Sequence, residues 1–136
     1  MNTGERLKAA HLRVTKMRIR ILDILETHAT PMAHTEILLQ APGMDRVTLY
    51  RVLDSLVEAG LVHRVQGTDG TWRFCAHDED TEGCPGGHAH FLCETCGKMY
   101  CLTDQKIPHF NQPNDFTVTH KQMLLLGICK QCKDHR

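Results

Sequence analysis

The chain has 136 residues, 16 basic against 16 acidic side chains, and an unusual share of cysteine and histidine, seven and ten residues respectively. No apolar run approaches the roughly 20 residues that a membrane-spanning helix requires, so we expect no membrane partner. The odd cysteine count, two C-x-x-C pairs and the absence of a signal-peptide pattern argue against a secreted disulfide scaffold. We therefore expect a cytoplasmic protein with reduced thiols.

The neutral net charge hides a basic N-terminal arm. Residues 1–20 carry six basic side chains and one acidic side chain, Glu5. Such an arm is typical of a surface that faces phosphate groups, although basic helix faces are more often simply solvated. The basic residues are Arg6, Lys8, Arg13, Lys16, Arg18 and Arg20.

The first half of the chain predicts helices separated by turn residues. Thr15 can cap a helix that ends near Pro31, in which apolar residues recur at i, i+4, i+7 and i+8. A short helix over roughly 34–40 follows and ends where Pro42 and Gly43 interrupt it. The apolar set of the longer helix is Met17, Ile21, Ile24 and Leu25.

Asp45 can cap a third helix, with Gly60 in the position of its C-terminal cap. The apolar stripe that would pack inward is Leu49, Val52, Leu53, Leu56 and Val57. The side chains that would face outward in the first turns are Arg46, Val47, Thr48, Tyr50 and Arg51. Arginine and hydroxyl groups at this end of a helix are what a recognition helix uses on phosphates and base edges.

Two strand-like segments, 61–65 and 71–75, flank a Gly-Thr-Asp-Gly turn and predict a β-hairpin. Three helices followed by a hairpin form a winged helix-turn-helix. The hairpin register stays open. If residue 66 pairs with residue 72, His63 stands opposite Cys75. If residue 66 pairs with residue 71, residue 62 stands opposite Cys75 instead.

The second half contains two cysteine knuckles, Cys93-x-x-Cys96 and Cys129-x-x-Cys132. Two matched knuckles complete the tetrahedral thiolate site that structural zinc prefers, and a redox-active disulfide is the alternative. Because little core is available, this zinc should supply much of the folding free energy of residues 88–136.

A second constellation combines residues from both halves of the chain. Imidazole and thiolate ligands together favour Zn²⁺ over hard cations. His88 and His90 alternate along one strand, directly after an acidic, glycine-rich segment, and a site with ligands on both sides of a hinge can report metal as a change of domain angle. The candidate regulatory ligands are His63, Cys75, His88 and His90, with Cys101 as an additional candidate.

Several motifs resemble the ferric uptake regulator family. They are Leu12-Arg13-Val14-Thr15, Thr48-Leu49-Tyr50-Arg51-Val52-Leu53, His88-x-His90-Phe-x-Cys93-x-x-Cys96-Gly and Gly127-x-Cys129-x-x-Cys132. The resemblance implies a homodimer whose metal-loaded form represses metal-uptake operons at an AT-rich inverted repeat in double-stranded DNA. It also implies DNA contacts by Arg13, Tyr50 and Arg51, to which the arm and the third helix add Lys16, Arg46 and Thr48.

These inferences give an α+β fold class: an N-terminal winged helix-turn-helix, then a small α/β dimerisation domain with a four-cysteine zinc site. The expected domains are a winged-helix DNA-binding domain over 1–76, an acidic glycine-rich hinge over 77–87, and a dimerisation and metal-binding domain over 88–136.

The identity of the sensed metal follows from the residue after the hairpin aromatic. Iron and peroxide sensors of this family use mostly His and carboxylate ligands, whereas Cys75 with His63 resembles the zinc uptake regulators. We therefore expect a zinc-responsive repressor with Zn²⁺ at both sites. The alternatives are an iron- or peroxide-responsive regulator with Fe²⁺ at the regulatory site, and a zinc-stapled interaction adaptor that never meets DNA.

Three further expectations complete the interpretation. We expect no enzymatic activity, because the histidines and cysteines suffice to close both sites and no His-Glu-x-x-His pattern is present. A third family site draws on the residues that flank His88 and His90, which here are Gly87 and Ala89. Because only His120, with His109 or Asp104, remains for it, this site is expected to be absent or weak. Cys84, in the hinge, is expected to be a bystander.

Overall fold

A computed structural model describes residues 2–28, 30–76, 88–118 and 121–134. The chain divides into two compact units, Met1–Thr81 and Glu82–Arg136. The expected hinge over 77–87, which includes Cys84, lies outside the described residues, as does His120. No helix in the described part of the chain is long and apolar enough to cross a membrane.

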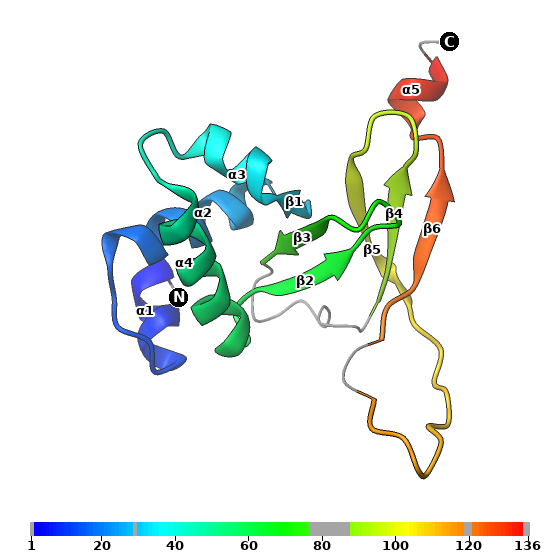
Figure 1. The fold of residues 1–136 in the computed structure, drawn as a ribbon, viewed down its shortest axis with the longest axis horizontal. Helices are drawn as coiled ribbons and strands as arrows, with labels where there is room; N and C mark the ends of the chain where they lie inside the picture. The colour runs from blue at the N-terminus through cyan, green and yellow to red at the C-terminus, as the bar shows by residue number, and fades with distance from the viewer. Residues whose placement is uncertain (1, 29, 77–87, 119–120, 135–136) are drawn as a thin grey trace. The chain divides into compact units, whose positions relative to one another are not determined.

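The described residues of the first unit form four helices, α1 (Thr3–Ala9), α2 (Lys16–His28), α3 (His34–Gln40) and α4 (Arg46–Glu58) (Figure 1). We did not predict α1. Its signal is a capping box, in which the Asn2 side chain accepts from the backbone N–H of Glu5 and the Glu5 carboxylate accepts from the backbone N–H of Asn2.

Helix α2 begins where predicted, because the Thr15 hydroxyl oxygen accepts a hydrogen bond from the backbone N–H of Arg18 at 3.2 Å. Its buried face is centred on Ile21, Leu22 and Leu25. The predicted inward position of Met17 is wrong, since this side chain is 37% exposed. At about 100° per residue, Met17 lies roughly 90° from the centre of the buried stripe.

Helix α4 follows the prediction closely. Asp45 accepts a hydrogen bond from the backbone N–H of Thr48, and Gly60 follows the last turn with φ of +79°. Four predicted stripe residues are buried and the fifth, Val57, packs partly buried against the same core. The buried four are Leu49, Val52, Leu53 and Leu56.

A three-stranded antiparallel sheet completes the first unit, with strand order β1-β3-β2. Strands β2 (His63–Gln66) and β3 (Trp72–Cys75) form the hairpin, and β1 (Met32–Ala33) pairs with the other edge of β3. The register pairs His63 with Cys75 and Gln66 with Trp72, so the first of the two alternatives holds. The two-residue β1 was not predicted because it is too short to show a period-two pattern.

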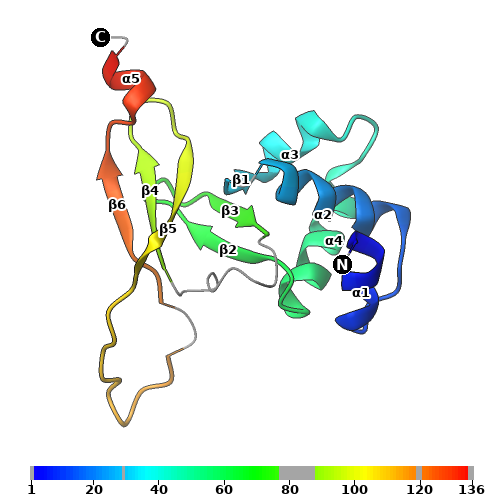
Figure 2. The same ribbon diagram turned by 180° about the vertical axis from the view of Figure 1, so that it is seen from behind.

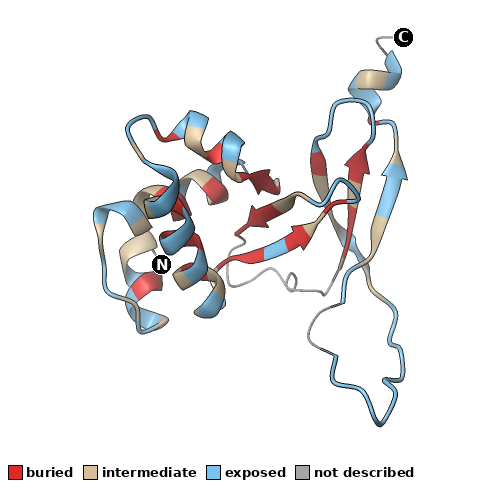
Figure 3. Ribbon diagram, in the orientation of Figure 1, coloured by how far each residue is buried: buried red, intermediate tan, exposed pale blue. Residues whose placement is uncertain are grey.

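The helices and the sheet of the first unit bury one apolar core (Figure 3). Helices α2 and α4 contact each other in it, and α3 contacts both. This arrangement of helices followed by a two-stranded wing is the predicted winged helix-turn-helix. The largest fully buried side chains include Leu7, Ile21, Leu25, Ile37, Leu49 and Leu56.

In its described residues the second unit forms a three-stranded sheet with a short helix after the last strand (Figure 2). The elements are β4 (His88–Cys93), β5 (Met99–Lys106), β6 (Leu124–Gly127) and α5 (Lys130–Asp134). Strand β4 is central, antiparallel to β5 and parallel to β6. Together the two units give the α+β class expected from the sequence.

Candidate metal centres and DNA-binding surface

The sheet of the second unit brings the two cysteine knuckles side by side. Strand β4 ends at Cys93 and strand β6 ends at Gly127, and these two residues pair across the parallel ladder. The backbone N–H of Glu94 continues that pairing by donating to the carbonyl of Gly127 at 2.8 Å. The chain segments that follow both strands therefore leave the sheet at the same edge.

Each knuckle then returns its second cysteine toward its first. After β4, the backbone N–H of Gly97 donates to the carbonyl of Cys93 at 2.9 Å, and Gly97 adopts a φ of +77° that favours glycine. After β6, the N–H of Lys133 donates to the carbonyl of Cys129 at 2.9 Å, and this helical turn sets Cys132 three residues along on the same side.

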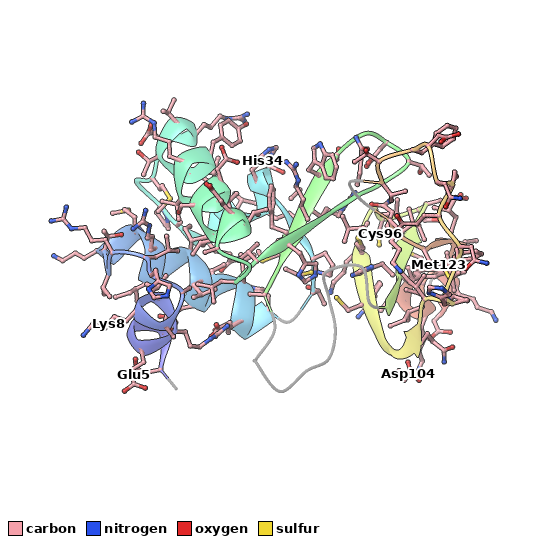
Figure 4. The ribbon with its side chains drawn as sticks, turned by 90° about the horizontal axis from the view of Figure 1, so that it is seen from below. Glu5, Lys8, His34, Cys96, Asp104 and Met123 are labelled. Carbon is pink, nitrogen blue, oxygen red and sulfur yellow. The ribbon has the colours of Figure 1, made fainter. Side chains whose placement is uncertain are left out.

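The four sulfur atoms consequently form a compact cluster, all within 4.8 Å of one another. The sulfurs of Cys96 and Cys129 are 3.9 Å apart. A tetrahedral zinc site with Zn–S bonds of about 2.3 Å requires sulfur–sulfur separations of about 3.8 Å. The structure thus brings Cys93, Cys96, Cys129 and Cys132 together, and this donor set fits a structural zinc ion. Figure 4 labels Cys96, the most exposed of the four.

Backbone N–H groups stabilise the thiolate form of Cys93, which is the form that binds a metal. The Cys93 sulfur accepts N–H groups from Cys96 and Cys129, each at 3.4 Å. These hydrogen bonds lower the pKa of the Cys93 thiol to about 6, because they stabilise the thiolate. The thiol of Cys132 is different, since the neighbouring Cys129 sulfur, followed by burial, raises its pKa to about 12. Metal binding requires thiolates, so Cys93 offers a charged ligand near neutral pH before Cys132 does.

The first unit holds half of the predicted regulatory site. Because His63 and Cys75 are cross-strand partners, their side chains lie on the same face of the sheet. The Cys75 sulfur is 2.8 Å from Nε2 of His63, and both side chains are buried. A buried thiol in contact with an imidazole is a ready pair of soft and borderline metal ligands.

The second unit holds the other predicted regulatory ligands on β4 and β5. His90 is buried and pairs directly with Cys101, which is half-buried. His88 begins β4 at a break in the register, where it pairs with Lys106. Asp104 and His109, which the third family site would need, are exposed and belong to none of the metal-ligand clusters found among the described residues.

The outward face of α4 carries most of the predicted DNA contacts. Arg46, Tyr50 and Arg51 are exposed. Thr48 lies in the first turn, and its hydroxyl group donates to the Asp45 carboxylate within the helix cap. The Tyr50 ring meets the His34 ring edge to face at 4.8 Å between centroids, with His34 at the start of α3 (Figure 4). Sequence reasoning missed this contribution of His34, because a lone histidine at a helix start carries no periodic signal.

Only part of the basic N-terminal arm has the exposure that a phosphate-facing surface requires. Arg13, Lys16 and Lys8 are exposed. By contrast, Arg6 is buried and forms an ion pair with Glu26, which corrects our expectation for that residue. Two further arm residues, Arg18 and Arg20, make hydrogen bonds to other residues of the first unit. Arg18 donates to the carbonyl of Arg13 and to the Ser55 hydroxyl, and Arg20 donates to the carbonyl of Pro42.

Comparison with known proteins places these features in a family. The sequence profile described as the ferric uptake regulator family matches residues 9–125. The peroxide-responsive repressor PerR of Staphylococcus aureus is 30% identical over an aligned length of 139, and the alignment covers 94% of this chain and 87% of that protein.

Solved structures share the fold. The ferric uptake regulator of Vibrio cholerae has a TM-score of 0.64 at 23% identity, covering 93% of this chain and 98% of that one. A zinc uptake regulator complexed with zinc and DNA has a TM-score of 0.66 at 20% identity, covering 96% and 90%. The profile match, the PerR relative and the paired knuckles lead to one conclusion: this chain belongs to the ferric uptake regulator family.

Proposed function

We propose that the chain is a homodimeric, zinc-responsive transcriptional repressor that controls metal-uptake genes. The observation that carries the choice of metal is the buried contact between the Cys75 sulfur and Nε2 of His63 at 2.8 Å. A thiolate–imidazole pair favours zinc over the harder cations that carboxylate-rich sites prefer. The resemblance to zinc uptake regulators at these two positions supports the same choice.

We propose that the regulatory zinc takes His63 and Cys75 from the winged-helix unit and His90, with His88 and in addition Cys101, from the second unit. A structural observation and a thermodynamic argument support this assignment. Each unit by itself presents a preformed cross-strand pair, His63 with Cys75 and His90 with Cys101. Zinc ligation by both pairs would favour one arrangement of the units, and a metal shifts an equilibrium only by its differential affinity for the two states.

The DNA-binding part of the proposal rests on the exposed first turns of α4. Arg46, Tyr50 and Arg51 present two guanidinium groups and a phenol at the helix N-terminus, and the arm adds the exposed Arg13 and Lys16. The operator that fits a dimer of such units is an inverted repeat in double-stranded DNA. That it is AT-rich follows from the resemblance.

The test is fluorescence anisotropy of the full-length protein on duplex DNA selected from a random library, with free zinc set by a metal buffer. Wild type should bind tightly only above a threshold of free zinc. Cys75→Ala should lose that zinc dependence while it keeps the knuckle zinc, and Cys84→Ala serves as the matched thiol control. Undiminished zinc-dependent binding by Cys75→Ala would remove Cys75 from the sensing role.

A second candidate, a peroxide-responsive repressor with Fe²⁺ at the same ligands, has its support in the 30% identity to PerR of Staphylococcus aureus. Anaerobic loading with Fe²⁺, followed by peroxide and peptide mass spectrometry, separates the two. An added oxygen atom on His63 or His90 with loss of DNA binding would favour the peroxide sensor, whereas unmodified histidines favour the zinc sensor.

A further inference from the structure

Val47 stands out among the side chains of α4. It occupies the second residue of the helix, and 56% of its surface is exposed. The apolar residues that α4 uses for packing lie on the opposite side and begin at Leu49, which is fully buried. Val47 therefore contributes nothing to the core of its own unit.

The neighbours of Val47 on the helix surface make an apolar centre with charged edges. Tyr50, three residues along, lies beside it on the same face and is 39% exposed. Arg46 precedes Val47 directly, and Arg51 follows at i+4, both exposed. The valine methyl groups and the tyrosine ring are thus flanked by two guanidinium groups at the N-terminal end of the helix, where the helix dipole also attracts phosphate.

Helix formation does not explain a valine at this position. A β-branched residue is a poorer helix former than alanine, and an exposed position offers no packing to compensate. The same branching holds the side chain in one χ1 rotamer within a helix, so the two methyl groups point in a fixed direction. A rigid apolar group inside a basic surface suits a partner that is negatively charged and carries an apolar group at a defined place.

We propose that Val47 reads the C5-methyl group of thymine in the major groove and so sets base specificity at one position of each half-site. Thymine alone among the four bases presents a methyl group in that groove. The flanking arginines bind the backbone phosphates and fix the height of the helix above the base edge. This inference rests on the proposed function and deepens it by naming the base that the residue recognises.

The test replaces thymine with deoxyuridine, which removes the methyl group and leaves the hydrogen-bonding edge intact. Duplexes are first selected from a random library with zinc-loaded wild-type protein, and single thymines in each half-site are then changed to deoxyuridine. At one position, wild type should lose about fourfold in affinity, the equivalent of one buried methyl group. Val47→Ala should bind both duplexes equally, whereas Val47→Thr, which keeps one methyl, should retain part of the discrimination.

The outcomes separate this inference from the function on which it rests. Val47→Ala should unfold at the same temperature as wild type or higher, because alanine favours the helix, so a loss of discrimination is not a loss of fold. If zinc-loaded wild type selects no duplex, the proposed function fails and the inference falls with it. If wild type binds but every deoxyuridine substitution costs Val47→Ala as much as it costs wild type, only the role of Val47 is refuted.

Discussion

Removing the metal from the cysteine knuckles should unfold the second unit and leave the winged helix folded. The perturbation is chelation of zinc from the full-length protein, or the substitution Cys132→Ser, which takes one sulfur from the cluster. The matched control is Cys84→Ser, since Cys84 belongs to neither of the two proposed metal sites.

The expected size of the effect follows from how little apolar surface the second unit buries. Apart from the ligands Cys93 and Cys129, the buried apolar residues described there are Ala89, Leu92 and Met99. Burying Leu92 and Met99 contributes about 1.5–3 kcal/mol each, and one alanine methyl adds less than about 1 kcal/mol. Structural zinc binding in small peptides contributes about 10–16 kcal/mol at pH 7. Within one protomer the metal is therefore the larger stabilising contribution, and the apolar burial of that protomer alone does not offset the entropy of ordering this unit.

Hydrogen–deuterium exchange measured by mass spectrometry resolves the two units in one experiment. Peptides from β4 and β6 should lose protection on chelation, including the amides of His90 and Glu94, which donate across the β4–β6 ladder. Peptides from α2 and α4 should keep theirs. The reasoning would be refuted by a metal-free protein that retains full protection of β4 and β6, or by loss of protection in both units together.

Three further predictions concern the winged helix. Leu53→Ala, at a residue 1% exposed in the core, should destabilise the first unit by about 3 kcal/mol, measured by urea denaturation. Hydrogen bonds from the Thr48 side chain and backbone hold the pKa of Asp45 below its ordinary value of 3.8. The ionised Asp45 cap therefore stabilises the folded protein above pH 3.8, and this stabilisation is lost as the pH falls through the lower pKa of the folded state. The difference in Tm between wild type and Asp45→Asn should accordingly be constant near neutral pH and change only below about pH 4. Arg51→Ala should lower the slope of log affinity against log salt by about 1 for each protomer on the DNA, and an unchanged slope would mean that Arg51 meets no phosphate.

The elements that the sequence predicted well are those with long periodic patterns or an explicit capping residue. Helix α4 shows both, with Asp45 before it and an apolar stripe along it. The two knuckles could be predicted from the spacing of their cysteines alone, because a C-x-x-C pair fixes the local ligand geometry independently of the rest of the fold.

Helix α1 escaped prediction although its capping box between Asn2 and Glu5 is local. The other features that escaped prediction depend on contacts between distant parts of the chain. Met32 and Ala33 form strand β1 because they pair with the edge of β3 that β2 leaves open. A two-residue segment carries no sequence pattern that would predict such a pairing. The burial of Arg6 follows from its ion pair with Glu26 across the α1–α2 contact, whereas its sequence neighbourhood is simply basic.

The hairpin register shows where sequence reasoning reached its limit. Two loop lengths were compatible with the turn residues, and only one sets His63 opposite Cys75. The conformation of the turn fixes the register, because the backbone N–H of Gly67 donates to the carbonyl of Thr71 and Gly70 adopts a positive φ. A shift by one residue would have turned one of these two proposed ligands to the opposite face.

The central position of β3 has a mechanical consequence. Cys75 ends this strand, and the preceding residue, Phe74, pairs with Met32 on β1 and with Arg64 on β2. Strand β1 runs directly into α3, whose first residue, His34, carries the ring that touches Tyr50. The strand that ends at Cys75 is therefore bonded on one side to the wing and on the other side to the strand that leads into α3, so Cys75 and the Tyr50 ring stand at the two ends of one continuous series of contacts.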